Sequence, residues 1–576
     1  MSSINPAKVR TWPAFVVLAM QGAAILYSVS AEFDNLSRFI AMMAGPAVSL
    51  LLFLVYWFGF SRIPWRDRLR LPLVSLVAAV VVGVLAHSTA RPAMWIYGIP
   101  LTLFLMTTWT LLNRFESPHG HPRRGAVLLA LGWLPFLLVR LEGFSGSYLP
   151  ELVWRWTPTT EERLAFTRPA RDASASDTAT PPPALQSSPQ DWPGFRGLNR
   201  DSRVVGARIN ADWTAKPPKQ LWKIAVGPGW SSFAIVGDSL FTQEQFGAEE
   251  AVVCYNAMTG LERWRHVDAA RFSELVAGPG PRATPTFADG RIYTLGAEAN
   301  FNCLDAATGR VIWRRDLMQE IGAKLPEWGF AASPLVMAGL AIVNADGTEG
   351  RGLVAYNAVT GEPAWHVPSP GMNFSSAQRM VFGEKEFAVF ASGTEVFAVD
   401  PQSGEILWRS SPTGWKAASM IQPQQIDASS LVVGLGDGIG TARLQVIPSA
   451  GNAWSTTQLW SSKNLKPSFN DFVFYQGALY GFDQSIFACV DAQTGKRLWK
   501  KGRYGFGQAL LFEDQGLILV VAETGELVLL ACDPKVHREL ARYPAITGKT
   551  WNHPAFSRGR LYVRNGEEAV CLDLSP

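Results

Sequence analysis

The chain has 576 residues, of which 48% are hydrophobic and 17% charged, and its 52 Lys and Arg stand against 48 Asp and Glu. This length exceeds what one hydrophobic core supports, so at least two domains are expected. Residues 1–150 hold 12 Lys and Arg against 5 Asp and Glu, which leaves 40 against 43 for the rest; this slightly acidic remainder argues against a nucleic-acid partner.

Five apolar runs in the first 150 residues approach or reach the roughly 20 residues that cross a bilayer core. They cover about residues 13–31, 39–60, 71–87, 94–113 and 125–139. We therefore expect residues 1–150 to form an α-helical membrane domain of about five spans.

Two of these runs allow a second interpretation. The fifth run is the shortest, although Arg123, Arg124 and Arg140 flank it where their side chains can reach the headgroups. Without it, the C-terminal part would lie on the other side of the membrane. The first run also fits a signal peptide, because Val29 and Ala31 suit a small-residue cleavage site.

Loop charges predict the orientation of the spans. Five spans place nine Lys and Arg on the side of the N-terminus and only Arg38 and Arg91 on the other. Because positively charged loops stay in the cytoplasm, we expect a multi-pass protein of the bacterial inner membrane with its C-terminal part in the periplasm. No Asp, Glu or Lys interrupts the runs, so we expect an anchor in the lipid bilayer and not a proton path.

Residues 151–190 follow the membrane domain and include the stretch ASASDTATPPPALQSSPQ. This composition, with almost no apolar periodicity after Phe166, is typical of a flexible linker. We therefore expect a spacer between the membrane domain and a second domain that begins near residue 191.

A repeated motif, [Asp/Asn]-x-x-[Thr/Ser]-Gly-x-x-x-Trp, dominates the rest of the chain. It runs from Asn256 to Trp264, Asp305 to Trp313, Asn357 to Trp365, Asp400 to Trp408, and Asp491 to Trp499. In each copy an apolar strand precedes the Asp or Asn, whose side chain caps a tight turn, and the Gly takes the left-handed conformation. Strand pairs that repeat every 40 to 50 residues predict a propeller of four-stranded blades.

Further copies of the repeat give the number of blades. Trp222 and Trp460 mark two blades whose turn is missing or degenerate, and a weak copy lies near Arg542 and Tyr543. The total predicts an all-β, eight-bladed propeller over residues 191–576. We expect residues 220–225 to supply the outer strand of the blade that residues 551–573 begin, because this pairing protects the edges of the ring.

Four of the five cysteines stand two residues before the turn Asp or Asn, where other blades have alanine. They are Cys254, Cys303, Cys489 and Cys571. Equivalent positions in different blades are too far apart for a disulfide, whose Cα atoms lie about 4–7 Å apart. Buried free thiols are therefore expected, with no disulfide framework.

The motif Ala/Cys-x-Asp-x-x-Thr-Gly-x-x-x-Trp resembles the tryptophan-docking motif of PQQ-type (quinoprotein-like) propellers, over roughly residues 191–576. The resemblance implies that the motif Trp packs between neighbouring blades and does not touch a cofactor. The docking residues would be Trp222, Trp264, Trp313, Trp365, Trp408, Trp460 and Trp499. The stretch DWPGFRGLNRDSRVVG, residues 191–206, is similar to the opening of many bacterial PQQ-binding-like repeat proteins.

Two kinds of relative compete within this resemblance. Five spans favour membrane-bound quinoprotein dehydrogenases of the glucose dehydrogenase type, whereas the length favours non-catalytic propellers similar to the outer-membrane assembly factor BamB. About 386 residues for eight blades leave little beyond four strands and turns in each. The dehydrogenases insert substrate-pocket segments, and they hold Ca²⁺ through Glu, Asn and Asp ligands; no complete ligand set aligns here.

The loops that lead into the innermost strands converge on the propeller axis, the usual ligand site of the fold. Arg282 and Lys416 could meet the carboxylates of an anionic quinone, tryptophans could stack on it, and Asn470 with Asp471 could bind a hard cation. The candidate cofactor-binding residues are Trp230, Arg282, Trp328, Trp415, Lys416, Asn470, Asp471, Trp551 and His553. The alternative is that these side chains fill and hydrate the channel and bind nothing.

The sequence therefore favours a membrane-anchored periplasmic propeller that works as a binding or scaffold module with an envelope protein partner. We expect no catalytic residue, no metal site and no cofactor under this hypothesis. The alternative is a membrane-bound quinoprotein dehydrogenase that uses PQQ with Ca²⁺ to oxidise a sugar or alcohol and reduces membrane quinone.

Overall fold

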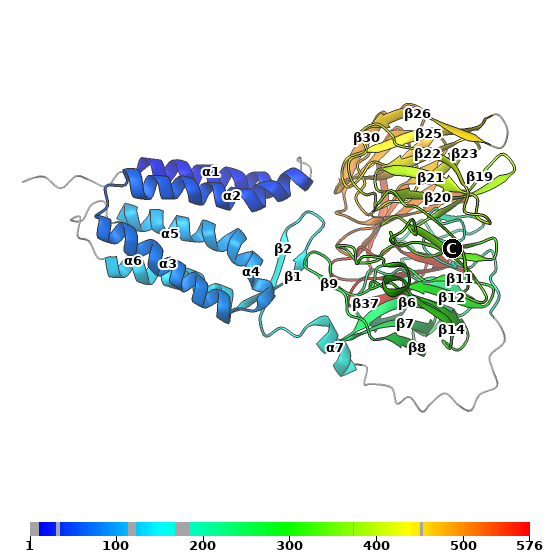
Figure 1. Cartoon of the computed structure of the whole chain (residues 1–576), viewed down its shortest axis with the longest axis horizontal. Coiled ribbons are helices and arrows are strands. Elements are labelled where there is room, and N and C mark those ends of the chain that lie inside the picture. Colours follow the sequence, from blue (N-terminus) through cyan, green and yellow to red (C-terminus); the bar gives the residue numbers. More distant parts are fainter. Residues whose placement is uncertain (1–10, 30–34, 113–121, 168–184, 372–373, 450–452) are drawn as a thin grey trace, which may run out of the picture. The chain divides into compact units, whose positions relative to one another are not determined.

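The structure is a computed structural model that describes residues 11–29, 35–112, 122–167, 185–371, 374–449 and 453–576. It divides into two compact units. The first comprises Met1–Pro158 with Leu275–Gly278, and the second comprises Thr159–Glu274 with Pro279–Pro576. Figure 1 shows the helices of the first unit in blue and cyan and the strands of the second in green to red.

The first unit is helical and ends in a short hairpin. Its helices are α1 (Trp12–Val29), α2 (Asn35–Val55), η1 (Tyr56–Phe60), α3 (Trp65–Leu85), η2 (Ser88–Ala90), α4 (Arg91–Ala93), η3 (Met94–Gly98), α5 (Ile99–Leu112), α6 (Pro122–Trp133) and η5 (Leu134–Leu137). Strands β1 (Val139–Phe144) and β2 (Pro150–Trp154) pair antiparallel. Aromatic side chains form the core between the helices, where Phe53 stacks on Trp57 at 5.6 Å.

Two helices of this unit, within the described residues, are long and apolar enough to cross a membrane, against about five expected. They are Ile40–Phe60 and Trp65–Leu85, and Trp12–Tyr27 is a shorter apolar helix. The expected fifth span, 125–139, does not form one helix, because α6 ends at Trp133 and β1 begins at Val139. The 12 residues of α6 rise about 18 Å, and the 3₁₀ turn η5 that continues it to Leu137 adds about 8 Å, which together fall short of a bilayer core of about 30 Å.

The expected linker is structured over part of its length. Strand β2 occupies its first residues, and α7 (Thr160–Thr167) follows, with Glu162 in its first turn accepting a hydrogen bond from Thr159 N at 2.7 Å. Residues 168–184 lie outside the described residues. The spacer that composition predicted therefore does not begin at residue 151.

The second unit is an eight-bladed propeller, as the repeat predicted. Seven sheets have four antiparallel strands, and one has five because β3 (Arg203–Val204) pairs parallel with β31. Blades one to four are β5–β8 (Ala234–Val236, Ser239–Phe246, Glu249–Asn256, Glu262–Asp268), β11–β14 (Thr286–Ala288, Arg291–Leu295, Asn300–Asp305, Val311–Asp316), β15–β18 (Leu335–Met337, Leu340–Asn344, Leu353–Asn357, Pro363–Val367) and β19–β22 (Gln378–Phe382, Lys385–Ser392, Glu395–Val399, Ile406–Ser410).

Blades five to eight complete the ring. They are β23–β26 (Gln424–Asp427, Ser430–Gly434, Thr441–Pro448, Trp454–Ser462), β27–β30 (Val473–Tyr475, Ala478–Asp483, Ile486–Asp491, Arg497–Arg503), β31–β34 (Gln508–Phe512, Leu517–Val521, Glu526–Ala531, Arg538–Pro544) and β35–β37 (Ala555–Ser557, Arg560–Arg564, Glu568–Asp573) with β4 (Lys219–Ala225). Smaller elements are β9 (Ser273–Glu274), β10 (Gly278–Pro279), α8 (Leu317–Ile321) and η6 (Glu513–Gln515).

The ring closes by the pairing that was expected between residues 220–225 and the blade of residues 551–573. Strand β4 adds antiparallel to β37, the third strand of the last blade, and Trp222 stands opposite Cys571. The weak copy near Arg542 proves to be the outer strand of the seventh blade. Every blade of the ring thus has four strands, and the fold confirms eight blades.

The motif Trp packs on the turn of the next blade. Trp264 Nε1 donates to Ala306 O at 3.2 Å, and Trp313 Nε1 donates to Ala358 O at 3.1 Å. The turn glycine receives the ring: a Cβ on Gly309 would lie 2.5 Å from Trp264, and Gly309 also has a φ of +76°. The repeated Gly therefore serves both the turn and the inter-blade contact.

Trp408 departs from this pattern. Its ring is buried, but Nε1 has no hydrogen-bond partner within the described part of the chain. The next blade joins β25 to β26 through residues 449–453, which lack the Asp-x-x-Thr-Gly turn that receives the other tryptophans. The missing partner follows from the degenerate turn.

The four motif cysteines are buried free thiols that stand opposite the tryptophans across a strand pair. Cys254 faces Trp264, Cys303 faces Trp313 and Cys489 faces Trp499. Burial raises the pKa of these thiols, and of Cys571, to about 12, so they stay protonated. A small side chain is needed here because the indole occupies the neighbouring space.

Candidate functional site

The segment of residues 191–204 lies against the innermost strands of several blades. Trp192 forms an antiparallel bridge with Ile235 of the first blade. Pro193 O accepts a hydrogen bond from the backbone N–H of Phe287, in the second blade, at 2.7 Å. Further along, Arg200 donates to Ser333 O and Pro334 O of the third blade at 3.1 and 3.0 Å. We refer to residues 191–204 as the axial segment.

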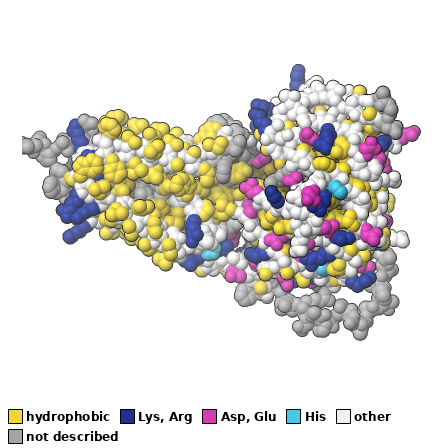
Figure 2. Space-filling model, in the orientation of Figure 1, with side chains coloured by type: hydrophobic (Ala, Val, Ile, Leu, Met, Phe, Trp, Pro, Cys, Tyr) yellow, Lys and Arg dark blue, Asp and Glu magenta, His cyan; other side chains and the backbone are white. Residues whose placement is uncertain are grey.

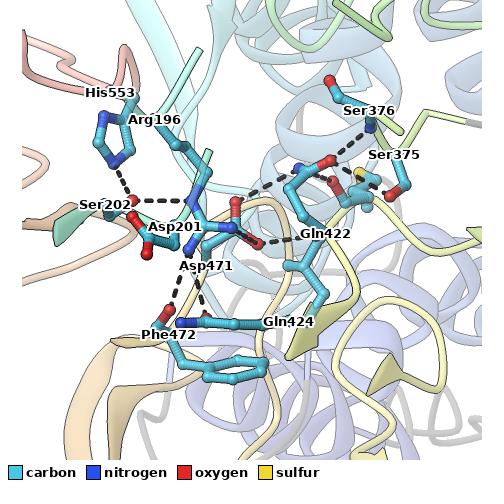
Figure 3. Close-up of polar contacts among 12 residues, drawn as sticks. Arg196, Asp201, Ser202, Ser375, Ser376, Gln422, Gln424, Asp471, Phe472 and His553 are labelled. Carbon is cyan, nitrogen blue, oxygen red and sulfur yellow. Dashed lines mark hydrogen bonds and ion pairs between the residues drawn. The ribbon is translucent and has the colours of Figure 1, made fainter. Parts of the chain in front are cut away.

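Arg196 is the centre of a buried polar network in the axial segment (Figure 3). Its side chain has no exposed surface, and its guanidinium donates to Ser202 Oγ at 2.7 Å and to Phe472 O at 3.1 Å. It also donates to Gln424 Oε1 at 3.4 Å and pairs with Asp471 Oδ1 at 3.5 Å. Three distant parts of the chain thus meet at one side chain.

His553 closes this network on the side of the eighth blade. Its Nε2 lies 2.7 Å from Ser202 Oγ and its Nδ1 lies 2.7 Å from Pro554 O. Burial, with Arg196 nearby, lowers the pKa of His553 to about 3, so the ring is neutral at physiological pH. A neutral ring between two fixed partners has the contacts of a structural histidine.

A belt of hydrogen bonds joins consecutive blades around the axis. In blades one to five the belt residue stands two positions before the innermost strand, and its backbone N–H donates to the side chain of the belt residue in the next blade. The bonds run from Ser232 to Thr284, Thr284 to Ser333, Ser333 to Ser376, Ser376 to Gln422, and Gln422 to Asp471. Ser232 Oγ donates to His553 O, which joins the first blade to the eighth.

Asp471 belongs to both the belt and the Arg196 network. Its Oδ1 accepts Gln422 N at 2.7 Å and its Oδ2 accepts Gln422 Nε2 at 3.3 Å. Burial raises the pKa of Asp471, and Arg196 with the Gln422 hydrogen bonds opposes that rise. Asn470 beside it is also buried, and its Oδ1 accepts Ser468 N at 3.0 Å. These two side chains, which the sequence offered as cation ligands, have partners within the fold.

Two other candidates, Trp230 and Trp551, form an aromatic cluster with Lys549. The rings of Trp230 and Trp551 lie 4.9 Å apart, and Lys549 Nζ lies 4.7 Å from the Trp551 ring and 5.7 Å from the Trp230 ring. Trp551 Nε1 donates to Glu523 Oε1 at 3.0 Å. Because Lys549 already lies over both rings, their faces have a cation partner from the same chain.

The remaining four candidates do not converge. Arg282 is held by Glu274 at 3.0 Å and lies over the Phe272 ring, and burial lowers its pKa to about 10. Trp415 donates to Ala417 O at 2.7 Å. Lys416 is exposed and Trp328 is half-buried.

A quinone cofactor with Ca²⁺ does not fit this arrangement. Asp471 is fixed by Gln422 and Arg196, and His553 is fixed by Ser202 and Pro554. No group of three or more His, Cys, Asp or Glu residues that could hold a metal ion occurs in the described ranges. Asp471 and His553 therefore act as ties between blades.

An open cavity of 1080 Å³ lies beside the axial segment. Its walls come from residues 197–203 and from the innermost strands of blades two to five. Leu198 and Val381, which line it, keep 55% and 41% of their surface exposed. The cavity thus combines exposed apolar side chains with a polar rim that includes Arg379 and Gln425.

Sequence reasoning missed Arg196, Ser202, Gln422 and Gln424 as site residues. Arg196 lies in the WPGFRG stretch, from which only a family resemblance was inferred. The belt had a readable signal, because the residue two positions before the innermost strand is polar in seven blades and Phe506 in the other. That signal requires the strand boundaries to be known within one residue.

Comparison with known proteins gives a consistent picture. Residues 248–501 match the family model described as outer membrane protein assembly factor BamB. An outer membrane protein assembly factor BamB of Burkholderia pseudomallei (strain K96243) is 26% identical over 314 residues, which cover 53% of this chain and 74% of that protein.

Similar solved structures include BamB from Moraxella catarrhalis, at 14% identity and a TM-score of 0.45, covering 62% of this chain and 97% of that one. A quinohemoprotein alcohol dehydrogenase from Comamonas testosteroni has 13% identity and a TM-score of 0.48, covering 67% of this chain and 80% of that one.

Proposed function

We propose that this chain, a PQQ-like β-propeller protein similar to BamB, is a membrane-anchored binding or scaffold module of the cell envelope. The observation that carries the proposal is the filled propeller axis. Arg196, Asp471 and His553 hold one another and the blades together, so the place where a catalytic propeller keeps its cofactor is used here for structure.

The surface of the helical unit supports a membrane anchor. Figure 2 shows hydrophobic side chains gathered over the helices of this unit. On α3 the exposed side chains include Leu73, Val77, Val80 and Val84, with exposed fractions from 54% to 72%. Apolar side chains on the outside of a helix are favoured in lipid and disfavoured in water. We infer a multi-pass location in the bacterial inner membrane, with the propeller in the periplasm.

The curated relative supports a protein partner, since its name describes an assembly factor for outer membrane proteins. The cavity beside the axial segment is the surface that we assign to such a partner. Exposed Leu198 and Val381 offer apolar contact, and the polar rim offers hydrogen bonds, a combination typical of protein interfaces.

Site-specific photo-crosslinking in cells tests the partner surface. A photoreactive residue in place of Leu198 should give discrete cross-linked species, whereas the same residue in place of Met258, an exposed side chain of the first blade, should not. Identical cross-linking patterns at the two positions would contradict a partner at the cavity.

The dehydrogenase alternative is tested on the full chain in detergent. After incubation with PQQ and Ca²⁺ followed by gel filtration, we expect no retained quinone and no dye-linked oxidation of sugars or alcohols. Retention with turnover would refute the binding function as stated here. Retention without turnover would assign PQQ to a structural or sensing role.

A further inference from the structure

The sixth blade carries an unusual excess of positive charge. Residues 463–506 hold seven Lys and Arg against three Asp, whereas residues 423–462 and 507–550 on either side each hold more acidic than basic residues. The basic residues are Lys463, Lys466, Lys496, Arg497, Lys500, Lys501 and Arg503, and we refer to them as the basic surface. All seven are exposed or half-buried.

The three carboxylates of this blade do not neutralise the basic surface. Asp471 is buried at the axis with Arg196. Asp491 caps its turn by accepting the N–H and the hydroxyl of Thr494, both at 2.7 Å. Only Asp483 contacts the basic surface, so within residues 463–506, all of which the structure describes, the cations outnumber their carboxylate partner.

Asp483 gathers three of the cations at one point. Its side chain has no exposed surface, and Arg497 and Lys500 approach its Oδ2 at 2.7 and 2.8 Å, while Lys466 Nζ lies 3.5 Å from Oδ1. One negative charge therefore holds three positive charges, and the cluster keeps a net charge of two. The remaining N–H donors of these half-exposed side chains can meet a second anion.

An apolar side chain lies among the cations. Leu498, on β30 between Arg497 and Trp499, keeps 44% of its surface exposed. Cations interleaved with exposed apolar groups are typical of surfaces that bind the headgroup region of an anionic bilayer. A phosphate diester supplies the negative charge, and the outer acyl region accepts the apolar side chain.

We propose that the basic surface of the sixth blade docks the propeller on anionic phospholipid. This inference rests on the proposed membrane anchor, because the two units belong to one chain and the anchor would keep the propeller at high effective concentration near the bilayer. Each Lys or Arg close to an anionic bilayer adds attraction, which falls off within a Debye length and weakens with salt.

Hydrogen exchange of the full chain in nanodiscs tests the proposal. Peptides that cover β30 should exchange more slowly in phosphatidylcholine with phosphatidylglycerol than in phosphatidylcholine alone, and added salt should remove the difference. Peptides that cover β14, an outer strand of the second blade, should exchange equally in both. Equal exchange of β30 in both nanodiscs would overturn the proposal.

Charge reversal supplies the matched variants. Lys496→Glu with Lys501→Glu should weaken docking by at least about thirty-fold, because the loss of two attractions alone has this effect and the two new carboxylates add repulsion. Arg310→Glu with Lys324→Glu changes the net charge equally, on exposed sites of the second blade and of the segment that follows it, and should leave the protection of β30 intact. Equal losses in the two variants would show a non-specific charge effect and overturn the proposal.

Two further experiments distinguish this proposal from the binding of soluble phosphate and from a failure of the proposed anchor. If inorganic phosphate protects β30 in nanodiscs of phosphatidylcholine alone, the surface binds a soluble phosphate and the lipid assignment is wrong. If alkaline carbonate removes the full chain from membranes, the proposed anchor fails, and exchange of the chain added to preformed anionic vesicles still tests the basic surface on its own.

Discussion

At the residue scale, Arg196 connects three distant parts of the propeller sequence. It is fully buried, and its guanidinium reaches Ser202 in its own segment and Phe472 in the sixth blade. Its partner Asp471 is buried as well. A buried ion pair adds little net stability compared with apolar residues, but removal of one partner is costly because the other charge stays buried and unpaired.

Substitution of Arg196 tests this role. Arg196→Met should lower the free energy of unfolding of the propeller by about 3–5 kcal/mol, because Asp471 loses its counter-charge. Chemical denaturation of the full chain in detergent, followed by tryptophan fluorescence, measures the change. Arg208→Met, at an exposed arginine, is the control and should be nearly neutral.

The second variant of Arg196 distinguishes charge from packing. Arg196→Met combined with Asp471→Asn removes both charges and should recover part of the lost stability. If the double variant is no more stable than Arg196→Met alone, the contribution of Arg196 comes from its hydrogen bonds to Ser202 and Phe472 and not from the ion pair.

Glu250 provides a pH-dependent prediction. Burial, with Glu298 and Asp268 nearby, raises its pKa from 4.5 to about 7, although Ala297 N–H and Arg282 oppose the rise. Between these pH values the unfolded chain has lost this proton and the folded chain still holds it, so stability falls as pH rises from 4.5 to about 7.

Glu250→Gln removes this cost above neutral pH. We expect the substitution to change the free energy of unfolding more favourably at pH 8 than at pH 5, by about 1–3 kcal/mol, as the raised pKa implies. Thermal unfolding at the two pH values measures the gain. Glu249→Gln, at the exposed neighbour, should show no such pH dependence, and an equal gain there would contradict the assignment.

At the element scale, the strand–turn–strand repeat explains the inter-blade contacts. Each motif tryptophan reaches the turn of the following blade, where the glycine has no side chain to block it. Trp313 also packs against Phe301 at 5.2 Å within its own blade. The same eleven residues therefore build a hairpin and attach it to its neighbour.

Trp313→Ala removes one such wedge. It should lower the free energy of unfolding by about 3–5 kcal/mol, the usual cost of a large-to-small change in a core. Denaturant titration checks the value. A loss below about 1 kcal/mol would show that Trp313 is not held between the blades.

Trp408 offers a matched comparison, because it lacks the hydrogen bond that Trp313 makes. Trp313→Phe should cost about 1 kcal/mol more than Trp408→Phe, the net contribution of one hydrogen bond. Equal costs would mean that the indole N–H contributes nothing to blade docking.

At the scale of the whole molecule, the number of spans decides on which side of the membrane the propeller lies. Charge bias with five spans predicts the periplasm, whereas the two helices that meet the length and hydropathy criteria would return the chain to the cytoplasm. The two counts give opposite outcomes.

A C-terminal alkaline phosphatase fusion distinguishes them. We expect an active enzyme, because the proposed location places the C-terminus in the periplasm. A fusion after Arg62, in a loop that the charge bias assigns to the cytoplasm, is the control and should be inactive. An inactive C-terminal fusion would refute the five-span topology and the periplasmic location together.

The sequence by itself determined the number of blades, the closure of the ring by residues 220–225 and the docking role of the tryptophans. These features repeat every 40 to 50 residues, and each depends on contacts within one hairpin or between consecutive blades. The buried thiols of Cys254, Cys303 and Cys489 could be predicted for the same reason, since each faces the tryptophan of its own motif.

Only the tertiary structure decided what lies at the axis and how the apolar runs divide into helices. Arg196 and Phe472 are 276 residues apart, and no spacing in the sequence records that they meet. Hydropathy reports composition along a run, but it cannot report where α6 ends and β1 begins. Local repeats fix an architecture because their contacts are local, whereas polar contacts across the axis depend on the closed ring that brings their residues together.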